Sequence, residues 1–518
     1  MKINRKTKVL IWGAAALLLV GLGILAWFLI PGLGAPAAPS IMDYVPTGVP
    51  TAGPVAEYWP IDGWRTSTPE EQGFDSVKLA EGLNTLRENQ SAINSLLIIR
   101  NGYVILDAYF YPYDDSFPHD LASVTKSVTT TLIAIATEQG KLQLDQPMVT
   151  YFPNRTIANL DDRKQSITVR NLTGMVNGMK SGCLDGDEST LDAMRSAPDW
   201  VQAALDRKMT NQPGKVFCYD SPGMHLLSAI LQETTGMTEL DFAQQNLFEP
   251  LGIRDVYWES DPQGYSHGWG DLHLRPRDAA KIGYLWLHNG VWEGRQIVPA
   301  DWVADAVKVQ IKTGRKDNYG YGWWVSDNNY SAMGRGGQNI KVYPALNIIV
   351  VTTAGGFDYA TLDPILEAAF ADPEKPLPAN PEGMAQLEGV LAELKVGQAA
   401  QPATSLPETA AEISGKIYAC EANSAGVNTL RFEFNGLETA EMYMKQNGSD
   451  FLWTIGLDGK YRMAPEGLTR GYWEDPQTFI IQLFDIGTRT RNLHFDGDRL
   501  EVDIPEAGLT LKCQVQNP

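Results

Sequence analysis

The residues whose types and spacing most directly indicate chemistry are Ser123 and Lys126. They lie three positions apart at the start of an apolar, helix-periodic run over residues 128–136. Residues i and i+3 share one face of a helix, so the serine oxygen and the lysine nitrogen are expected within hydrogen-bond distance. A serine hydroxyl is a weak nucleophile until an adjacent base activates it. The pair predicts nucleophilic catalysis, although a capped helix start followed by a solvated lysine is the alternative that these positions alone leave open.

Several further motifs follow this pair along the chain. They are Ile167 to Leu172 with Asn177-Gly178, Pro213-Gly214, the segment 219–227, Pro250-Leu251-Gly252, the segment 270–278 and Gly334-Arg335-Gly336-Gly337-Gln338. In type and order they resemble the motifs of the serine beta-lactamase and penicillin-binding-protein superfamily. The resemblance covers residues 59–371 and is greatest to the class C-like serine hydrolases, which include esterases, D-aminopeptidases and 6-aminohexanoate-dimer hydrolases.

The resemblance implies roles for individual residues. Ser123 would attack a substrate carbonyl, and Lys126 with Tyr219 would carry its proton to the leaving group. That transfer requires either a neutral lysine amine or an anionic tyrosine. The backbone N–H groups of Ser123 and Gln338 would form the oxyanion hole. The implied substrate-binding residues are Ser221, Arg335, Gly336, Gly337 and Trp269.

Two positions depart from the pattern that the superfamily shows. Ser221 stands where an asparagine is usual, and a hydroxyl cannot offer the paired donor and acceptor of an amide. Arg335 stands where the third motif has lysine or histidine, and its guanidinium can still hold a carboxylate with two parallel hydrogen bonds. Both departures are more similar to the aminohexanoate-dimer-hydrolase branch than to true beta-lactamases.

A second serine motif, Gly264 to Gly268, matches the G-x-S-x-G pattern of a nucleophile elbow. The elbow needs a strand before the serine and a helix after it, whereas Asp261-Pro262-Gln263 indicates a turn. Ser266 is therefore not expected to be catalytic. The chain has six histidines and neither an H-E-x-x-H nor a C-x-x-C motif, so no metal and no cofactor are expected.

The elements that must position these residues begin and end with strands. Asn101-Gly102 between the apolar segments 93–100 and 103–109 predicts a β-hairpin. Strand patterns return over 319–325, 339–343 and 346–353, and a closing helix is expected over 362–370. The long stretch between, 137–315, is rich in helix patterns. Strands at both ends of residues 57–373 predict an α+β domain, with one antiparallel sheet and a helical insertion.

The pattern changes after this domain. Residues 374–410 hold two breaks, the first rich in Pro and the second in Ala, Pro and Thr, around an amphipathic segment at 384–394, and are expected to be a linker with a short helix. Over 411–518, short strand patterns alternate with Gly, Asn and Asp turns, as at 430–434, 451–455, 478–483 and 509–514. They predict a separate small all-β domain, whose role the sequence leaves open.

The N-terminus predicts a membrane anchor. The basic segment 1–8 precedes an uncharged apolar run over 9–30 that is long enough to span a bilayer as a transmembrane helix. Basic flanks stay in the cytoplasm, so the rest of the chain, beginning with a linker over 31–56, is expected to be extracytoplasmic. The expected location is the cell membrane, single-pass. A cleaved signal peptide, which would give a secreted protein, is the alternative.

The four cysteines suit an oxidising compartment. Pairing within each region, Cys183 with Cys218 and Cys420 with Cys513, is the simplest connectivity, and four buried thiols are the alternative.

The 518 residues are enough for two or three domains. The net charge of −20 and the absence of a basic cluster beyond the N-terminus argue against nucleic acid as a partner. The expected partner is a small-molecule or peptide acyl substrate, and the oligomeric state stays open. The predicted function is an extracytoplasmic serine hydrolase of esters or amides. A D,D-peptidase acting on cell-wall peptides and a catalytically retired binding or regulatory protein are the alternatives.

Overall fold

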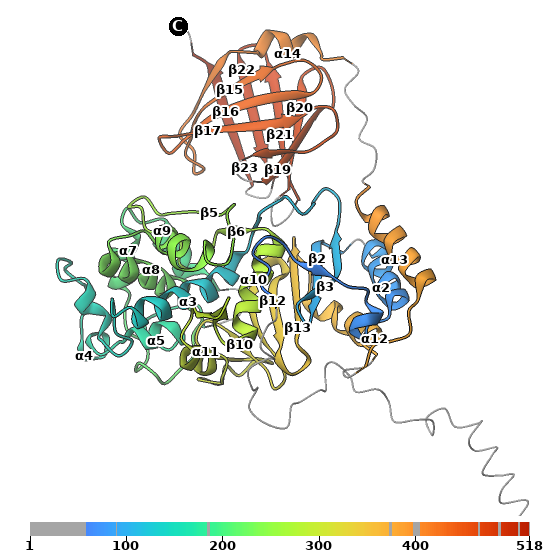
Figure 1. The fold of residues 1–518 in the computed structure, drawn as a ribbon. Coiled ribbons are helices and arrows are strands. Elements are labelled where there is room, and N and C mark those ends of the chain that lie inside the picture. Colours follow the sequence, from blue (N-terminus) through green and yellow to red (C-terminus); the bar gives the residue numbers. More distant parts are fainter. Residues whose placement is uncertain are drawn as a thin grey trace, which may run out of the picture.

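The computed structural model describes residues 58–89, 91–183, 187–371, 375–396, 405–464, 467–484, 488–505 and 508–516. An α+β domain is followed by an all-β domain, which lies above it in Figure 1. These parts of the predicted fold class are confirmed.

The first domain contains an eight-stranded sheet with the order β1-β3-β2-β13-β12-β11-β10-β9. All neighbouring strands are antiparallel except β1 and β3, which are parallel. The pairing of β2 with β13, the third and fourth strands in this order, joins the two ends of the domain's sequence. The strands are β1 (Arg65–Thr66), β2 (Ile93–Arg100), β3 (Tyr103–Tyr109), β9 (Asn318–Tyr319), β10 (Trp324–Val325), β11 (Tyr330–Gly334), β12 (Gln338–Tyr343) and β13 (Ile348–Ala354).

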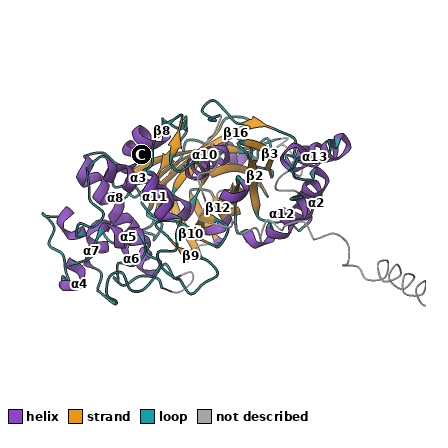
Figure 2. Ribbon diagram, turned by 60° about the horizontal axis from the view of Figure 1, so that its bottom comes forward, coloured by secondary structure: helices purple, strands orange, loops and turns teal. Residues whose placement is uncertain are grey.

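Both faces of this sheet are covered, because every residue of β2 is buried. Leu97 and Ile99 belong to the core that includes α10 (Pro276–Leu287). Leu96 and Ile98 point the other way, into a second core. Helices α2 (Ser76–Glu88), α12 (Asp363–Ala369) and α13 (Pro381–Leu394) build this second core, and they gather at one end of the domain in Figure 2.

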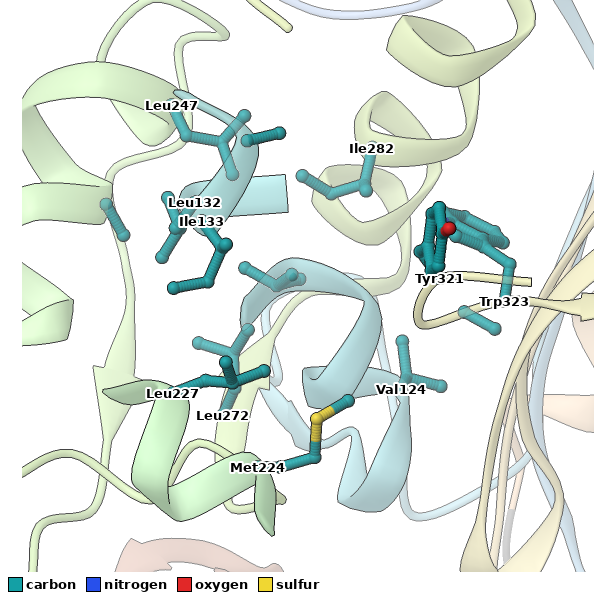
Figure 3. Close-up of a cluster of buried hydrophobic side chains, with 14 of the residues drawn as sticks. Val124, Leu132, Ile133, Met224, Leu227, Leu247, Leu272, Ile282, Tyr321 and Trp323 are labelled. Carbon is teal, nitrogen blue, oxygen red and sulfur yellow. The ribbon is translucent and has the colours of Figure 1, made fainter. Parts of the chain in front are cut away.

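The part of the chain between β3 and β9 in sequence forms a mainly helical region. Its centre is α3 (Thr125–Glu138), in which all residues from Thr125 to Ala136 are buried. Figure 3 shows Leu132 and Ile133 of α3 close to Leu227 of the neighbouring helix α8 (Ser221–Thr235). The shorter helices around them are α4 (Asp162–Gln165), α5 (Val169–Thr173), α6 (Ser189–Arg195), α7 (Trp200–Asp206), α9 (Glu239–Ala243) and α11 (Ala300–Ala306).

The second domain is a closed up-and-down barrel. Consecutive strands pair antiparallel except β17 and β18, and the first strand pairs with the last. A short parallel contact between β17 and β19, at Gly456 and Arg470, closes the ring. The strands are β14 (Ile417–Cys420), β15 (Val427–Phe434), β16 (Thr439–Gln446), β17 (Ser449–Gly456), β18 (Arg462–Ala464), β19 (Gly467–Trp473), β20 (Thr478–Phe484), β21 (Thr488–Asp496), β22 (Arg499–Ile504) and β23 (Leu509–Val515).

One end of the barrel is covered by the short helix α14 (Glu408–Ile413), which lies away from the first domain in Figure 1. The outer wall near the other end contacts the first domain. There the ring of Phe484 lies 6.5 Å from that of Tyr113, and the ring of Tyr461 lies 5.8 Å from that of Tyr111. Cys183–Cys218 and Cys420–Cys513 are both disulfides.

The predicted fold class needs one correction. It included a transmembrane helix over residues 9–30, and that segment lies outside the residues that the structure describes. Among the described residues, no helix is long and apolar enough to cross a bilayer. The longest of these, α8, has 15 residues, and at about 1.5 Å per residue it is shorter than a hydrocarbon core of about 30 Å. The fold is therefore an α+β domain with a C-terminal β-barrel, without a supported transmembrane helix.

Candidate active site

Ser123 lies in a short 3₁₀ helix, η2 (Ala122–Val124), directly before α3. The preceding residue, Ala122, has a φ of 46°. This left-handed conformation is uncommon for a residue with a side chain, and such residues cluster at functional sites. The N–H of Ala122 donates to the Asp120 carboxylate at 2.7 Å, which holds the turn. The Ser123 hydroxyl is thereby placed at the amino end of α3.

Lys126 is buried, with 1% of its surface exposed, so it is not the solvated lysine of the alternative interpretation. Its Nζ lies 2.7 Å from Ser123 Oγ and donates a second hydrogen bond, also at 2.7 Å, to the carbonyl of Trp269. The same nitrogen lies 4.9 Å from the centre of the Tyr219 ring. The structure therefore brings Ser123, Lys126 and Tyr219 together.

Tyr219 is held from three sides. It follows Cys218, whose disulfide fixes it to the segment around Cys183. It also forms an isolated β-bridge with Gly182. Trp324 of β10 stacks on its ring, with the two centroids 6.0 Å apart and the planes 19° apart. The ring is consequently fixed beside Lys126 by elements from both sides of the site.

The end of β11 lies against the backbone of the nucleophile. A Cβ added to Gly334 would lie 2.5 Å from the carbonyl oxygen of Leu121 and 3.1 Å from the nitrogen of Ser123. Only glycine fits such an approach. The chain then turns into β12 through Gly336 and Gly337, whose φ values are 83° and 99°. These glycines let strand β11 end beside Ser123 and reverse immediately.

A cleft with a volume of about 320 Å³ opens at Ser123. Acidic side chains lie on the loop before α6, and arginines lie on the loop before β9 and after β11. The cleft is lined by Ser123, Gly182, Asp187, Glu188, Tyr219, Arg315, Trp324, Met333, Gly334 and Arg335.

A family model for beta-lactamases matches residues 88–369, more than half of the 518-residue chain. The chain belongs to the beta-lactamase family. It is 23% identical over 309 residues to 6-aminohexanoate-dimer hydrolase of Paenarthrobacter ureafaciens, covering 55% of this chain and 79% of that protein. It is 28% identical over 192 residues to lovastatin esterase of Penicillium rubens, covering 33% and 46%. The octameric penicillin-binding protein homologue from Pyrococcus abyssi aligns with 83% of this chain and 98% of its own, at 16% identity and a TM-score of 0.44.

The family resemblance inferred from the motifs is thus confirmed, and the chain belongs to a family of hydrolases with the beta-lactamase fold. Four side chains that line the cleft carry no motif in the sequence: Asp187, Glu188, Arg315 and Met333. The first three lie in loops without a motif, and Met333 lies on β11, whose sequence Tyr-Ser-Ala-Met-Gly is a weak strand pattern. The sequence therefore provides no reason to place these four side chains in the cleft.

Several residues that the family pattern implied for substrate binding lie elsewhere. Trp269 is 5% exposed, and its ring stacks on His267 at 4.3 Å between centroids. Ser221 is buried as the first residue of α8, with its hydroxyl 3.5 Å from a Glu188 oxygen. Among the described residues that line the cleft, Arg335 contributes a side chain from this set, whereas neither Trp269 nor Ser221 does.

Gln338 is also outside the cleft lining in the part of the chain that the structure describes. Its side-chain amide donates to the carbonyl of Ala354 at 2.5 Å, and its carbonyl oxygen accepts from the N–H of Ala354 at 3.0 Å. The residue pairs with Gly334 across the β11–β12 ladder. Its side chain therefore joins β12 to β13 behind the cleft.

Ser266 of the second serine motif is 2% exposed. Its Oγ accepts a hydrogen bond from the N–H of Leu240 at 3.3 Å, and its carbonyl accepts one from Ser228 at 2.7 Å. It lies in a turn region rather than between a strand and a helix, and this placement agrees with the interpretation that it is structural.

The carboxyl group of Asp120, which accepts a hydrogen bond from the residue before Ser123, sets the charge close to the nucleophile. Burial raises the pKa of Asp120 to about 7, and the nearby Asp271 carboxylate adds to the rise, while the N–H of Ala122 and the Arg335 guanidinium act in the opposite direction. Asp271 itself is half-buried, and its hydrogen bond with His267 holds its pKa below the usual range. One carboxyl group near the site, that of Asp120, can thus change charge close to neutral pH.

Within the described residues, one group has the composition of a metal site, namely Glu259, His267 and Asp271. His267 Nδ1 lies 2.7 Å from Asp271 Oδ2 and 4.0 Å from Glu259 Oε2. The hydrogen bond between His267 and Asp271 is sufficient to orient the His267 ring without a metal ion. None of these three residues lines the cleft at Ser123.

Proposed function

We propose that this member of the beta-lactamase family is an extracytoplasmic serine hydrolase that cleaves an ester or amide bond through an acyl-enzyme on Ser123. The observation that carries the proposal is the 2.7 Å separation of Lys126 Nζ and Ser123 Oγ in a cleft. Nucleophile and base within hydrogen-bond distance, with the base oriented by a further group, is the arrangement that activates a serine. Here the orienting group is the carbonyl of Trp269.

The reaction would proceed in two halves. Ser123 Oγ attacks the substrate carbonyl carbon as its proton passes to the Lys126–Tyr219 pair, and the pair then gives a proton to the departing alcohol or amine. With the lysine amine neutral, an N–H can stay on the Trp269 carbonyl while the lone pair faces Ser123. Water then attacks the ester that joins the acyl group to Ser123, and the Lys126–Tyr219 pair removes a proton from this water. The acid product leaves as the pair returns a proton to Ser123 Oγ.

The oxyanion would be bound by backbone N–H groups. Ser123 supplies one, as the family pattern implies. For the second we assign the N–H of Arg335 instead of that of Gln338, because Arg335 lines the cleft and directly follows Gly334, whose backbone lies against the Ser123 nitrogen. Preorganised N–H donors stabilise the charge that develops in the tetrahedral intermediate.

The substrate class follows from the charges of the cleft. Arg335 and Arg315 line one part of it, and a guanidinium recognises a carboxylate by paired hydrogen bonds. Trp324 and Met333 provide apolar surface beside them. An acyl substrate that carries a carboxylate, either a small molecule or a short peptide, would fit this arrangement. The relatives named as a dimer hydrolase and an esterase support hydrolysis of amides and esters as the two reactions to examine first.

The proposed compartment rests on covalent chemistry. Both Cys183–Cys218 and Cys420–Cys513 are disulfides, and disulfides persist mainly in oxidising surroundings. We therefore propose that the described domains work outside the cytoplasm.

The proposal is tested by labelling the protein with a fluorophosphonate and identifying the modified peptide by mass spectrometry. We expect one tag, on Ser123, that is lost in Ser123→Ala and strongly reduced in Lys126→Ala. Ser266→Ala, which removes the serine of the second motif, should label like the wild type. A tag on Ser266, or a folded protein without any tag, would overturn the proposal, and the latter result would favour a binding role for the scaffold.

A D,D-peptidase is the second candidate, because the same two arginines could hold the C-terminal carboxylate of a cell-wall peptide. Intact-mass measurement after incubation with benzylpenicillin separates the two. A stable adduct on Ser123 with release of D-alanine from a peptide ending in D-Ala-D-Ala favours the peptidase, and turnover of neutral esters without an adduct favours the esterase or amidase.

A further inference from the structure

The turn formed by residues 267–271 carries the carbonyl that binds Lys126, and this turn is held between two helices. On one side, Thr129 of α3 donates to the carbonyl of Gly268 at 2.9 Å. On the other side Gly268 lies against α8, where a Cβ added to this glycine would collide with the carbonyl oxygen of Met224. The backbone of the turn is therefore fixed at Gly268 from both sides.

Aromatic rings hold the side chain of Trp269. The His267 ring stacks on the indole, with the two centroids 4.3 Å apart and the planes 20° apart. Trp200 of α7 stacks on the His267 ring at 5.1 Å, and His225 of α8 meets the indole at 5.0 Å in a T-shaped arrangement. Stacked and T-shaped pairs are the favourable geometries for aromatic rings. The orientation of the His267 ring therefore helps to fix the Trp269 side chain.

The His267 ring is in turn oriented by Asp271. His267 Nδ1 lies 2.7 Å from Asp271 Oδ2 and donates to it, since an ionised carboxylate only accepts hydrogen bonds. Asp271 has a φ of 63°, a left-handed conformation that is uncommon for a residue with a side chain. Glycine would adopt this conformation without steric cost, but it could not bond to His267. Strained residues of this kind cluster at functional sites.

Asp271 lies between two backbone contacts with the segment that carries the nucleophile and its base. Two positions before it, the carbonyl of Trp269 accepts a hydrogen bond from Lys126 at 2.7 Å. One position after it, the carbonyl of Leu272 accepts one from the N–H of Leu121, just before the nucleophile, at 2.9 Å. A change in the turn at Asp271 would therefore reach both contacts.

We propose that Asp271 is a positioning residue for the Lys126 base, an inference that rests on the proposed function. Its hydrogen bond keeps the His267 ring stacked on Trp269, and the held indole fixes the direction of the Trp269 carbonyl. That carbonyl keeps the lysine amine turned towards Ser123. Asp271 is not among the described residues that line the cleft. Its loss should therefore slow the attack by Ser123 without weakening the binding of substrate.

Variants of Asp271 test the proposal through the rate constant for fluorophosphonate labelling of Ser123 and through kcat and KM for 4-nitrophenyl butyrate. Asp271→Gly accepts the left-handed backbone but loses the bond to His267, so labelling and kcat should fall about tenfold while KM stays within about twofold. Asp271→Asn keeps an accepting oxygen and is tolerated in this conformation, so it should stay within about threefold of wild type. Glu293→Gly replaces an exposed acidic residue with a φ of 48° and is the matched control, which should behave as wild type.

His267→Phe examines the same link from the other partner. It keeps a ring against Trp269 but cannot bond to Asp271, so labelling should again fall about tenfold. Because both changes remove one interaction, the double variant His267→Phe/Asp271→Gly should be no slower than either single variant. If Asp271→Gly does not fold, His267→Phe alone carries the test.

Four results would overturn the inference. They are wild-type labelling in Asp271→Gly or in His267→Phe, losses that multiply in the double variant, a rise in KM without a fall in kcat, and Asp271→Asn as slow as Asp271→Gly. With Ser123 labelled in the wild type, any of these removes only the role of Asp271. A folded wild type without a label on Ser123 would remove the proposed function together with this inference.

Discussion

Lys126 donates a hydrogen bond to the main-chain carbonyl of Trp269 at 2.7 Å. Because the same nitrogen lies 2.7 Å from Ser123 Oγ, this carbonyl fixes the direction in which the amine faces the nucleophile. The segment that carries Trp269 is itself bound to α3, since Thr129 Oγ1 donates to the carbonyl of Gly268 at 2.9 Å. Trp269 thus acts on the site through its backbone.

Replacing Lys126 with alanine should lower kcat/KM by about 10²- to 10⁴-fold, because general-base assistance to Ser123 is lost. The Trp269 carbonyl would also lose its donor, at a cost of about 1–3 kcal/mol in the free energy of unfolding. Lys164 is a matched control, because it is fully buried and donates to the carbonyls of Ala158 and Leu205. Lys164→Ala should be destabilised to a similar degree while the folded enzyme keeps its kcat. Equal loss of kcat in both variants would contradict the assignment.

Removing the Cys183–Cys218 disulfide should reduce activity as well as stability. The bond ties Tyr219 to the loop that places Asp187 and Glu188 in the cleft. For a sequence separation of 35, we expect a loss of about 3–4 kcal/mol in the free energy of unfolding and roughly tenfold in kcat/KM from misplacement of the cleft. Assays of the Cys183→Ser/Cys218→Ser variant on an ester substrate give the comparison. Cys420→Ser/Cys513→Ser should lose stability but keep kcat/KM within about twofold.

Arg335 should select for a negative charge on the substrate. We expect Arg335→Gln to raise KM for mono-4-nitrophenyl glutarate about tenfold while KM for 4-nitrophenyl butyrate changes less than about twofold. Arg295→Gln removes an exposed arginine of strand β8 (Arg295–Gln296) and serves as the control. The same rise in KM for both esters would show that Arg335 shapes the cleft instead of recognising charge.

Glu239 should make the stability of the domain depend on pH. Burial raises the pKa of Glu239 to about 8 in the folded protein, although the neighbouring hydroxyl groups of Ser228 and Thr129 act against the rise. The ordinary value is near 4.3, so between about pH 4.5 and 8 unfolding releases a proton. Across that window stability falls as pH rises, by at most about 1.4 kcal/mol per pH unit, and above it the loss is complete.

Denaturant titrations at pH 5, 6, 7 and 8 measure this effect. Glu239→Gln should lack that component of the slope and should become increasingly more stable than wild type towards pH 8. The exposed Glu249→Gln variant should retain the wild-type slope. Parallel curves for wild type and Glu239→Gln would mean that the buried carboxyl group does not titrate in this range.

Local sequence patterns predicted several of the main elements. The Asn101-Gly102 turn indicated the β2–β3 hairpin, and the alternation in the C-terminal region indicated β15, β17, β20 and β23. The segment 319–325, expected as one strand, is two short strands, β9 and β10. Gly322, with a φ of 78°, lies between them in the bend that folds one strand onto the other. A continuous apolar pattern does not reveal such a reversal.

The candidate site was predictable where side chains do the chemistry. Ser123, Lys126 and Tyr219 carry motifs, and the structure brings them together. The carbonyl of Trp269 left no trace in the sequence, because any residue type supplies a carbonyl. Arg315 lies in a loop whose path depends on tertiary packing. Closure of the barrel likewise depends on one contact between Gly456 and Arg470, which pairing of sequence neighbours does not indicate.

The disulfide between Cys420 and Cys513 joins the first strand of the barrel to the last, where the two residues also pair in the β-ladder. A pulling force applied between the α+β domain and the C-terminus would pass through this bond and bypass the strands between. Most of the barrel is therefore shielded from tension along the chain. In a single-molecule stretching experiment, the oxidised protein should extend as if the segment between these cysteines were absent, and reduction should release that length.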